Sequence, residues 1–333
     1  MATSSPFAIA ATGIRKSYRD KVVLDGIDLA VPTGRIWSLL GPNGSGKTTM
    51  VHILTTLVRP DAGTVTIAGC DLTREPLGVR RAIGVTGQFA AVDELLTGEE
   101  NLRLMGELNN LSTRENRQRA SELLERFDLA DDARKVAGAY SGGMRRKLDL
   151  MMTLVGRPQI IFLDEPTTGL DPRSRHAMWA IIKEQAAQGV TIFLTTQYLD
   201  EADELAHEIA LLDGGRFVAQ GTPAELKRLV PGGHLVLTFD TEERRAQAAR
   251  ALQVPDPDPD ALVLRVPGHD DMQSLRQLLD RLGDAQIMPS GLNVHTPDLE
   301  DVFLTLTGRP KAADDPAPAP VRETTTVGQE ASR

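Results

Sequence analysis

A run of residues near the N-terminus has the spacing of a phosphate-binding loop, G-x-x-x-x-G-K-[ST]. It consists of Gly41, Pro42, Asn43, Gly44, Ser45, Gly46, Lys47, Thr48 and Thr49. Glycine lets the backbone approach phosphate oxygens closely, and the N-terminus of the helix that should follow attracts anions. We expect Lys47 to reach the β- and γ-phosphates of a nucleotide and Thr48 to offer its hydroxyl to Mg²⁺.

Two acidic residues, Asp164 and Glu165, follow the apolar run 160–163. Such a run is typical of a buried parallel strand, and ligands bind at the carboxyl edge of these strands. We therefore expect Asp164 to hold Mg²⁺ through water. Glu165 would then orient and deprotonate an attacking water, a role that contributes about 10²–10⁴ in rate. Without the phosphate loop, two exposed acids at a strand end would be the simpler interpretation.

A third segment, Ser141-Gly142-Gly143, precedes an amphipathic helical pattern. Serine is a favoured helix N-cap. The apolar face of the helix would consist of Met144, Leu148, Met151, Met152 and Val155. An ordinary capped helix explains this pattern structurally without assigning a function to it.

Together, the three segments resemble the ATP-binding cassette family, whose members drive transport with ATP. In that family the helix after the serine points its N-terminus at the γ-phosphate bound by another subunit, and the motif is usually L-S-G-G-Q. Here residues 140–144 are Tyr-Ser-Gly-Gly-Met, which keeps the serine and glycines but lacks the glutamine. The resemblance implies ATP and Mg²⁺ as ligands. It also implies a homodimer that sandwiches two ATP molecules, each held by Lys47 of one copy and Ser141 of the other.

Three further positions match the family pattern, and one departs from it. The resemblance implies that Tyr18 stacks on adenine, that Gln88 senses Mg²⁺, and that Asp171 lies in the loop that communicates across the dimer. Asp171 also fits an N-cap with Pro172 at the first helical position. Gln197 stands where most relatives have a histidine that contacts the γ-phosphate. A glutamine amide can donate and accept hydrogen bonds there but cannot take up a proton.

Three local segments indicate a branch of the family. Residues 86–94, 195–203 and 299–303 resemble the ATP-binding subunits of daunorubicin-type antibiotic exporters. In that branch glutamine commonly replaces the γ-phosphate histidine. The departure at Gln197 is therefore interpreted as a feature of a subfamily and not as loss of activity.

The strands and helices expected around these residues indicate an α/β fold. We expect a P-loop NTPase cassette over residues 5–220, with a mixed-sheet core and a helical insertion at about 89–157. Residue 35 begins a strand that leads into the loop, and the helix after the loop should stop at Arg59-Pro60. Capping boxes at Thr97 and Ser112 predict helices in the insertion. In the family this insertion docks on the membrane partner.

The C-terminal third should form a smaller unit. Residues 221–308 contain strand-like segments at 235–239 and 262–266 and helix-like segments at 242–252 and 272–282, which predicts a small α+β unit. Residues 309–333 are rich in Ala, Pro and Thr and poor in apolar residues, so we expect a disordered tail.

Composition narrows the possible partners. The chain has 333 residues and a net charge of −9. This charge argues against a nucleic-acid partner, because proteins that bind nucleic acid normally carry a basic face. The single cysteine excludes an internal disulfide, and the six histidines do not cluster as metal ligands. The first residues lack the pattern of a secretory signal. No apolar run reaches the roughly 18 residues of a membrane span. A transporter of this kind would use a separate permease and lie at the cytoplasmic side of the membrane.

Three functions remain to be compared. The best supported is the ATP-hydrolysing subunit of a two-component transporter that exports a drug, an antibiotic or a lipid-like compound. A soluble cassette ATPase of translation or DNA repair usually has two cassettes or a long coiled coil, and neither is present. A GTPase or a small-molecule kinase would leave Ser141-Gly142-Gly143 unexplained, and no Asn-Lys-x-Asp motif occurs.

Overall fold

The computed structural model describes residues 6–87, 91–230, 233–254, 262–267, 272–295 and 297–307. Gln88 and the tail 309–333 lie outside these ranges. The expectations for them therefore stay predictions.

Among the described residues, a mixed sheet of six strands forms the centre of the cassette, in the order β10-β9-β3-β8-β7-β6. Strands β9, β3, β8, β7 and β6 pair in parallel, and the edge strand β10 pairs antiparallel with β9. The strands are β3 (Ile36–Leu40), β6 (Ile83–Thr86), β7 (Ile160–Asp164), β8 (Thr191–Thr196), β9 (Glu208–Asp213) and β10 (Arg216–Gly221). The predicted mixed sheet is confirmed.

A second sheet covers one face of the central sheet. It has the order β2-β1-β4-β5 and consists of β1 (Phe7–Tyr18), β2 (Lys21–Pro32), β4 (Ala62–Ile67) and β5 (Cys70–Asp71). One core cluster joins this sheet to helix α1 (Lys47–Leu54) and to the central strands. Within it the rings of Trp37 and Phe193 stack with centroids 5.0 Å apart. Helix α2 (Pro76–Ala82) follows β5.

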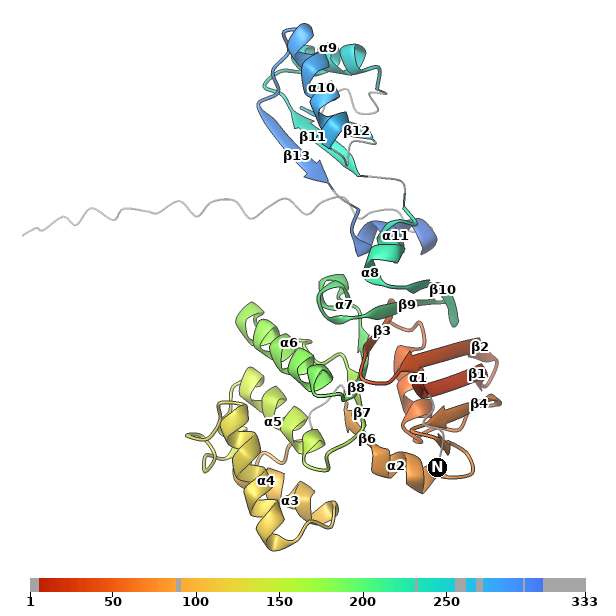
Figure 1. The fold of residues 1–333 in the computed structure, drawn as a ribbon, viewed down its shortest axis with the longest axis vertical. Coiled ribbons are helices and arrows are strands. Elements are labelled where there is room, and N and C mark those ends of the chain that lie inside the picture. The colour runs from red at the N-terminus through yellow and green to blue at the C-terminus, as the bar shows by residue number, and fades with distance from the viewer. Residues whose placement is uncertain are drawn as a thin grey trace, which may run out of the picture.

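Helices cover the other face of the central sheet. Residues of β7 and β8 pack there against α5 (Gly142–Leu154) and α6 (Pro172–Ala187), in one cluster with α3 (Gly98–Leu108) and α4 (Thr113–Arg126). Both faces of β7 are thus buried, which explains its continuous apolar sequence. The short η1 (Ala137–Ala139) precedes α5, and α7 (Leu199–Leu205) follows β8. In Figure 1, α3, α4 and α5 lie at the end of the molecule opposite the C-terminal unit.

Local structure in this helical part follows the sequence closely. Thr97 and Ser112 form the predicted capping boxes with Glu100 and Glu115. The apolar positions of α5 that the periodicity indicated are buried, apart from the half-buried Met144.

The predicted end of the helix after the phosphate loop is wrong. We expected Arg59-Pro60 to stop this helix, but α1 ends at Leu54. Thr56 has a φ of 65°, and its N–H donates to Ile53 O while the Leu57 N–H donates to His52 O at 2.8 Å. This is a Schellman motif, which closes a helix without proline.

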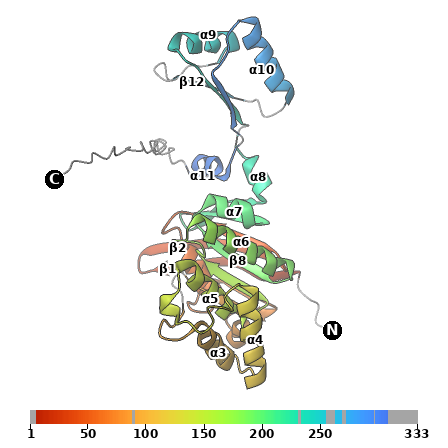
Figure 2. The ribbon, with the colours of Figure 1, turned by 90° about the vertical axis from the view of Figure 1, so that its left-hand side faces the viewer.

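The C-terminal part contains elements beyond those predicted. Antiparallel strands lie in the order β12-β11-β13, where β11 is His234–Thr238, β12 is Val263–Pro267 and β13, which was not predicted, is Gly291–His295. Helices α9 (Glu242–Leu252) and α10 (Met272–Asp284) agree with the expected segments. Both views place this unit at the far end of the molecule from α3 and α4 (Figure 2).

Two short helices connect this unit to the cassette. Helices α8 (Pro223–Lys227) and α11 (Leu299–Thr307) contact each other, although a long stretch of sequence separates them. Leu226 and Leu299 share one core cluster with Leu40 and Leu211 of the central sheet. The chain therefore leaves the cassette after α8 and returns to it at α11. The division of the chain at residue 220 stays a prediction.

Candidate functional site

The phosphate loop connects β3 to α1 at the carboxyl edge of the central sheet. Gly41 needs to be glycine because an added Cβ would lie 2.3 Å from the backbone oxygen of Leu212. Gly46 caps α1 with a φ of 115°, which favours glycine. These constraints fold the loop tightly over the start of α1, whose first N–H groups stay available to an anion.

Lys47 lies beneath this loop and is only 5% exposed. Its Nζ donates to Gly41 O at 2.8 Å and to Pro42 O at 3.2 Å. Burial lowers the pKa of Lys47, whereas the neighbouring Glu165 and Asp164 raise it. Among the described residues, the buried hydroxyl of Ser45 has no hydrogen-bond partner. A buried cation and an unpartnered hydroxyl at a helix start fit a bound phosphate.

Glu165 directly follows β7 and lies beside Lys47. Its Oε1 is 3.7 Å from Lys47 Nζ, and its Oε2 accepts from Thr168 Oγ1 at 3.3 Å. The backbone of Glu165 has a φ of 49°, in the left-handed region, and its N–H donates to Thr195 O at 3.0 Å. The structure therefore brings the predicted phosphate lysine, at the start of α1, and the predicted base, at the end of β7, together.

Asp164, the residue before Glu165, is 4% exposed. One of its carboxylate oxygens accepts a short hydrogen bond from the hydroxyl of Thr195. Carboxylate and hydroxyl oxygens are ligands that Mg²⁺ prefers, so Asp164 and the exposed Thr48 fit this ion. No group of three or more His, Cys, Asp or Glu side chains that could hold a metal occurs in the described residues.

The predicted Ser141-Gly142-Gly143 segment lies at the start of α5. The hydroxyl of Ser141 accepts from the Met144 N–H at 3.3 Å, so Ser141 is the expected N-cap. Ser141 and Gly142 are exposed. A Cβ added to Gly143 would lie 2.6 Å from Ser174 Oγ, and Ser174 is bound by Asp171, the N-cap of α6. Those hydrogen bonds lower the pKa of Asp171. Ser141, Gly143 and Asp171 thus belong to one surface region.

The remaining predicted residues occupy separate places. Tyr18 ends β1 with a 46% exposed side chain, and Lys16 Nζ lies 5.5 Å from its ring centroid. Gln197 follows β8 and lines a cavity together with Tyr198 and Leu299. Gln88 is outside the described residues.

Two buried charged residues near the site were not predicted. Glu201 of α7 is fully buried, and its carboxylate accepts from Thr167 Oγ1 at 2.8 Å and from Trp179 Nε1 at 3.0 Å. Burial raises the pKa of Glu201. Arg146 of α5 donates to backbone oxygens of residues 164–166. Charged residues in mixed-charge helices usually face solvent, so no sequence signal distinguished these two.

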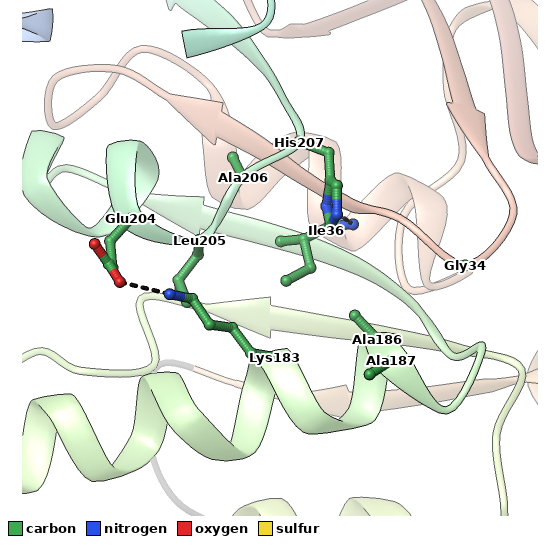
Figure 3. A pocket seen from close by; sticks show the side chains of 9 residues that line it. All are labelled: Gly34, Ile36, Lys183, Ala186, Ala187, Glu204, Leu205, Ala206 and His207. Atoms are coloured by element: carbon green, nitrogen blue, oxygen red, sulfur yellow. Dashed lines mark hydrogen bonds and ion pairs between the residues drawn. The ribbon is translucent and has the colours of Figure 1, made fainter.

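Another cavity lies at the opposite edge of the sheet, where β3 begins (Figure 3). The Lys183–Glu204 ion pair lies at one side of it. At the other side His207 Nδ1 accepts from the Ile36 N–H at 3.1 Å, and burial lowers the pKa of His207. None of the predicted site residues lines this cavity. The nucleotide site therefore has to be sought at the other edge of the sheet.

Comparison with known proteins agrees with this geometry. A family model described as ABC transporter matches residues 24–168. The daunorubicin resistance ATP-binding protein DrrA2 of Streptomyces coeruleorubidus is 46% identical over 91% of this chain and 95% of its own length. The chain belongs to the ABC transporter family. It is an ATP-binding subunit, with the ATPase activity that the sequence predicted.

Other matches to this ABC ATPase extend the comparison. The Nod factor export ATP-binding protein I of Ralstonia nicotianae is 37% identical over 90% of this chain and 94% of its own length. A solved ATP-binding subunit of an ABC transporter is 30% identical with a TM-score of 0.61, over 67% of this chain and 92% of that one. A dimeric post-hydrolysis state of the ATP-binding cassette MJ0796 bound to ADP and Pi matches with 27% identity and a TM-score of 0.59, over 64% of this chain and 98% of that one. The predicted fold class is confirmed.

Proposed function

We propose that this ATPase powers the export of a drug, an antibiotic or a lipid-like compound through a separate permease. The observation that carries the proposal is the near full-length similarity to drug-resistance proteins, 44–47% identical over 90–95% of this chain. The similarity to Nod factor export proteins supports the direction of transport. No comparison favours the alternative of a translation or repair factor.

The proposed chemistry assigns each part of the site one task. The loop from Gly41 to Thr49 binds the triphosphate, with Lys47 as its cation. Thr48, Gln88 and Asp164 hold Mg²⁺, which neutralises charge on the phosphates. Glu165 orients a water and takes its proton, and Gln197 donates to the γ-phosphate. Tyr18 stacks on adenine, for which its exposed ring is suited.

The proposed working form is a homodimer. Ser141, Gly142 and Gly143 of one copy would bind the ATP held by Lys47 of the other, and Asp171 would communicate across the interface. The exposure of Ser141 and Gly142 supports this arrangement, because the start of α5 is open to an anion. ATP binding would close the dimer, and hydrolysis would open it.

The proposed membrane partner is a permease subunit. No helix in the described part of this chain has the length and apolarity that a membrane crossing requires. We place the chain at the cytoplasmic side of the membrane, docked through the helices of the 89–157 region. Its conformational cycle would then move the permease.

Transport in membrane vesicles tests the proposal. Inside-out vesicles would contain this chain with its permease partner, and uptake of daunorubicin and of a fluorescent lipid would be measured. We expect ATP-dependent uptake of at least one compound, and no uptake with Glu165→Gln. ATP hydrolysis in the same vesicles without uptake of either class would contradict the export proposal.

A further inference from the structure

Arg146 makes an unusual set of contacts with the residues around the proposed base. It lies in the second turn of α5 and is 8% exposed. Its Nε donates to Pro166 O at 2.8 Å, and its Nη2 donates to Asp164 O and Glu165 O, each at 3.2 Å. One guanidinium thus binds the backbone oxygens of three successive residues.

The same guanidinium also reaches the segment that carries Gln88. Its Nη1 donates to Gly87 O at 2.8 Å and to Asp149 Oδ2 at 3.2 Å. Asp149 in turn accepts from the Ala91 N–H at 3.0 Å. Gly87 and Ala91 flank residues 88–90. Arg146 and Asp149 therefore tie both ends of that segment to α5.

The backbone of Glu165 explains why such a restraint is needed. Its φ of 49° is a left-handed conformation that costs free energy for any residue except glycine. Such a conformation persists only where the surroundings enforce it. The N–H of Glu165 donates to Thr195 O, and Arg146 binds the carbonyl oxygens of Asp164 and of Glu165 itself. The planar guanidinium can do this because its donors form a rigid fork, which a lysine lacks.

We propose that Arg146 is a positioning residue that holds Glu165 in its working conformation. It also couples Glu165 to the N-terminus of α5 and to the backbone at Gly87 and Ala91. The proposal rests on the proposed role of Glu165. The N-terminus of α5 carries Ser141, which would meet the nucleotide of the other copy, and the Arg146–Asp149 pair binds Gly87 and Ala91. A shift of α5 at either place moves the guanidinium and, through it, the carboxylate that activates water.

A purely structural role makes a different prediction. Arg146 could simply neutralise Asp149, whose pKa burial raises and the Arg146 charge lowers. In that case removal of the Asp149 charge would affect hydrolysis as strongly as a change at Arg146. A positioning role predicts that Asp149→Asn is much milder, because the guanidinium keeps its bonds to residues 164–166.

Steady-state kinetics of the full-length chain tests the proposal with Arg146→Lys, Arg146→Gln and Asp149→Asn. We expect both Arg146 variants to lower kcat by about ten- to a hundred-fold, the effect of losing hydrogen bonds to a charged group. ATP affinity should stay within about three-fold of wild type, since the Lys47 loop keeps its contacts. Arg145→Gln is the matched control: Arg145 is the neighbouring residue, pairs with Glu94 at 2.9 Å and is partly exposed. It should not change kcat.

Hydrogen exchange gives a second readout. Peptides that cover residues 160–171 should exchange faster in both Arg146 variants, and those from α9 should not. A wild-type kcat in Arg146→Lys, or parallel losses of kcat and ATP affinity, would overturn the proposal. So would a failure of both Arg146 variants to fold, because that would make Arg146 a general core residue. If Glu165→Gln itself still hydrolyses ATP, the site assignment fails; if it does not and Arg146→Lys equals wild type, only the role of Arg146 fails.

Discussion

Lys47, the first residue of α1, and Glu165, the residue after β7, meet at the carboxyl edge of the central sheet, with Nζ and Oε1 3.7 Å apart. The strands that precede them, β3 and β7, both pair in parallel with β8, so all three strands end at the same edge. The side chains are 5% and 10% exposed. A group that binds phosphate and a group that can take a proton from water therefore share one small, largely dry site.

Lys47→Ala should remove ATP binding. The buried site would lose its main cation, and hydrogen bonds to charged groups contribute about 1.5–3 kcal/mol each. We expect affinity to fall at least about a hundred-fold in a calorimetric titration. Lys183→Ala is the control, because Lys183 pairs with Glu204 at the opposite edge of the sheet. An unchanged ATP affinity in Lys47→Ala would rule out this site.

Gln197→Ala should slow hydrolysis by roughly ten- to a hundred-fold, the cost of one hydrogen bond to a charged phosphate. Gln197→His should stay active. Histidine titrates near pH 6–7 whereas glutamine does not, so the histidine variant should gain a pH-dependent step in its rate profile. Hydrolysis by the alanine variant at the wild-type rate would mean that Gln197 is only a polar residue at a strand end.

Glu201→Gln should become more stable relative to wild type as pH rises. Burial raises the folded-state pKa of Glu201 above the ordinary value of 4.5, so its contribution to stability is complete below that pH and declines above it. Glutamine does not titrate and can still accept from Thr167 and Trp179. Urea unfolding at intervals from about pH 5 to 8 measures the difference in free energy.

Glu204→Gln, in the same helix, is the matched control for Glu201. Lys183 lowers the pKa of the exposed Glu204, so its contribution to stability is present at high pH and is lost as pH falls. That loss occurs below about pH 4.5, so between pH 5 and 8 the stability of this variant relative to wild type should not change with pH. Parallel slopes for the two variants would contradict the assigned pKa directions.

Leu226→Ala should destabilise the whole cassette by about 2–5 kcal/mol, as large-to-small changes in a core do. Leu226 is 1% exposed and packs with the central sheet through Leu40 and Leu211. Leu229→Ala, at a position that is 56% exposed, should be nearly neutral. Denaturant unfolding measures both variants. A nearly neutral Leu226→Ala would contradict the packing of α8 against the central sheet.

The sequence identified the elements that carry local signals. Residue types at fixed spacing predicted the phosphate loop, the apolar face of α5 and the helix caps at Thr97, Ser112, Ser141 and Asp171. The end of α1 did not, because a Schellman motif at Thr56 leaves no glycine or proline to mark it. β13 was missed because its short segment lies in a small sheet, where tertiary pairing decides the structure.

The contacts of Arg146 and Glu201 could not be predicted, since they depend on how distant segments meet. Arg146 lies 18 or more residues before the carbonyl oxygens it binds in 164–166. Glu201 binds Thr167 and Trp179, which lie 34 and 22 residues away. A buried charge can be recognised only once its partners are placed, because its sequence pattern is that of a surface helix.

Turnover by Glu165→Gln tests the central claim most directly, because Glu165 is the proposed base of the ATPase. The full-length variant would be assayed for ATP binding, for steady-state hydrolysis and, by gel filtration with ATP, for dimerisation. Glu184→Gln, which changes a surface ion pair with Arg126, is the control. We predict that Glu165→Gln binds ATP, forms a stable dimer with it and loses essentially all turnover. Hydrolysis at more than about a tenth of the wild-type rate would contradict the assignment, because loss of a general base costs about 10²–10⁴ in rate.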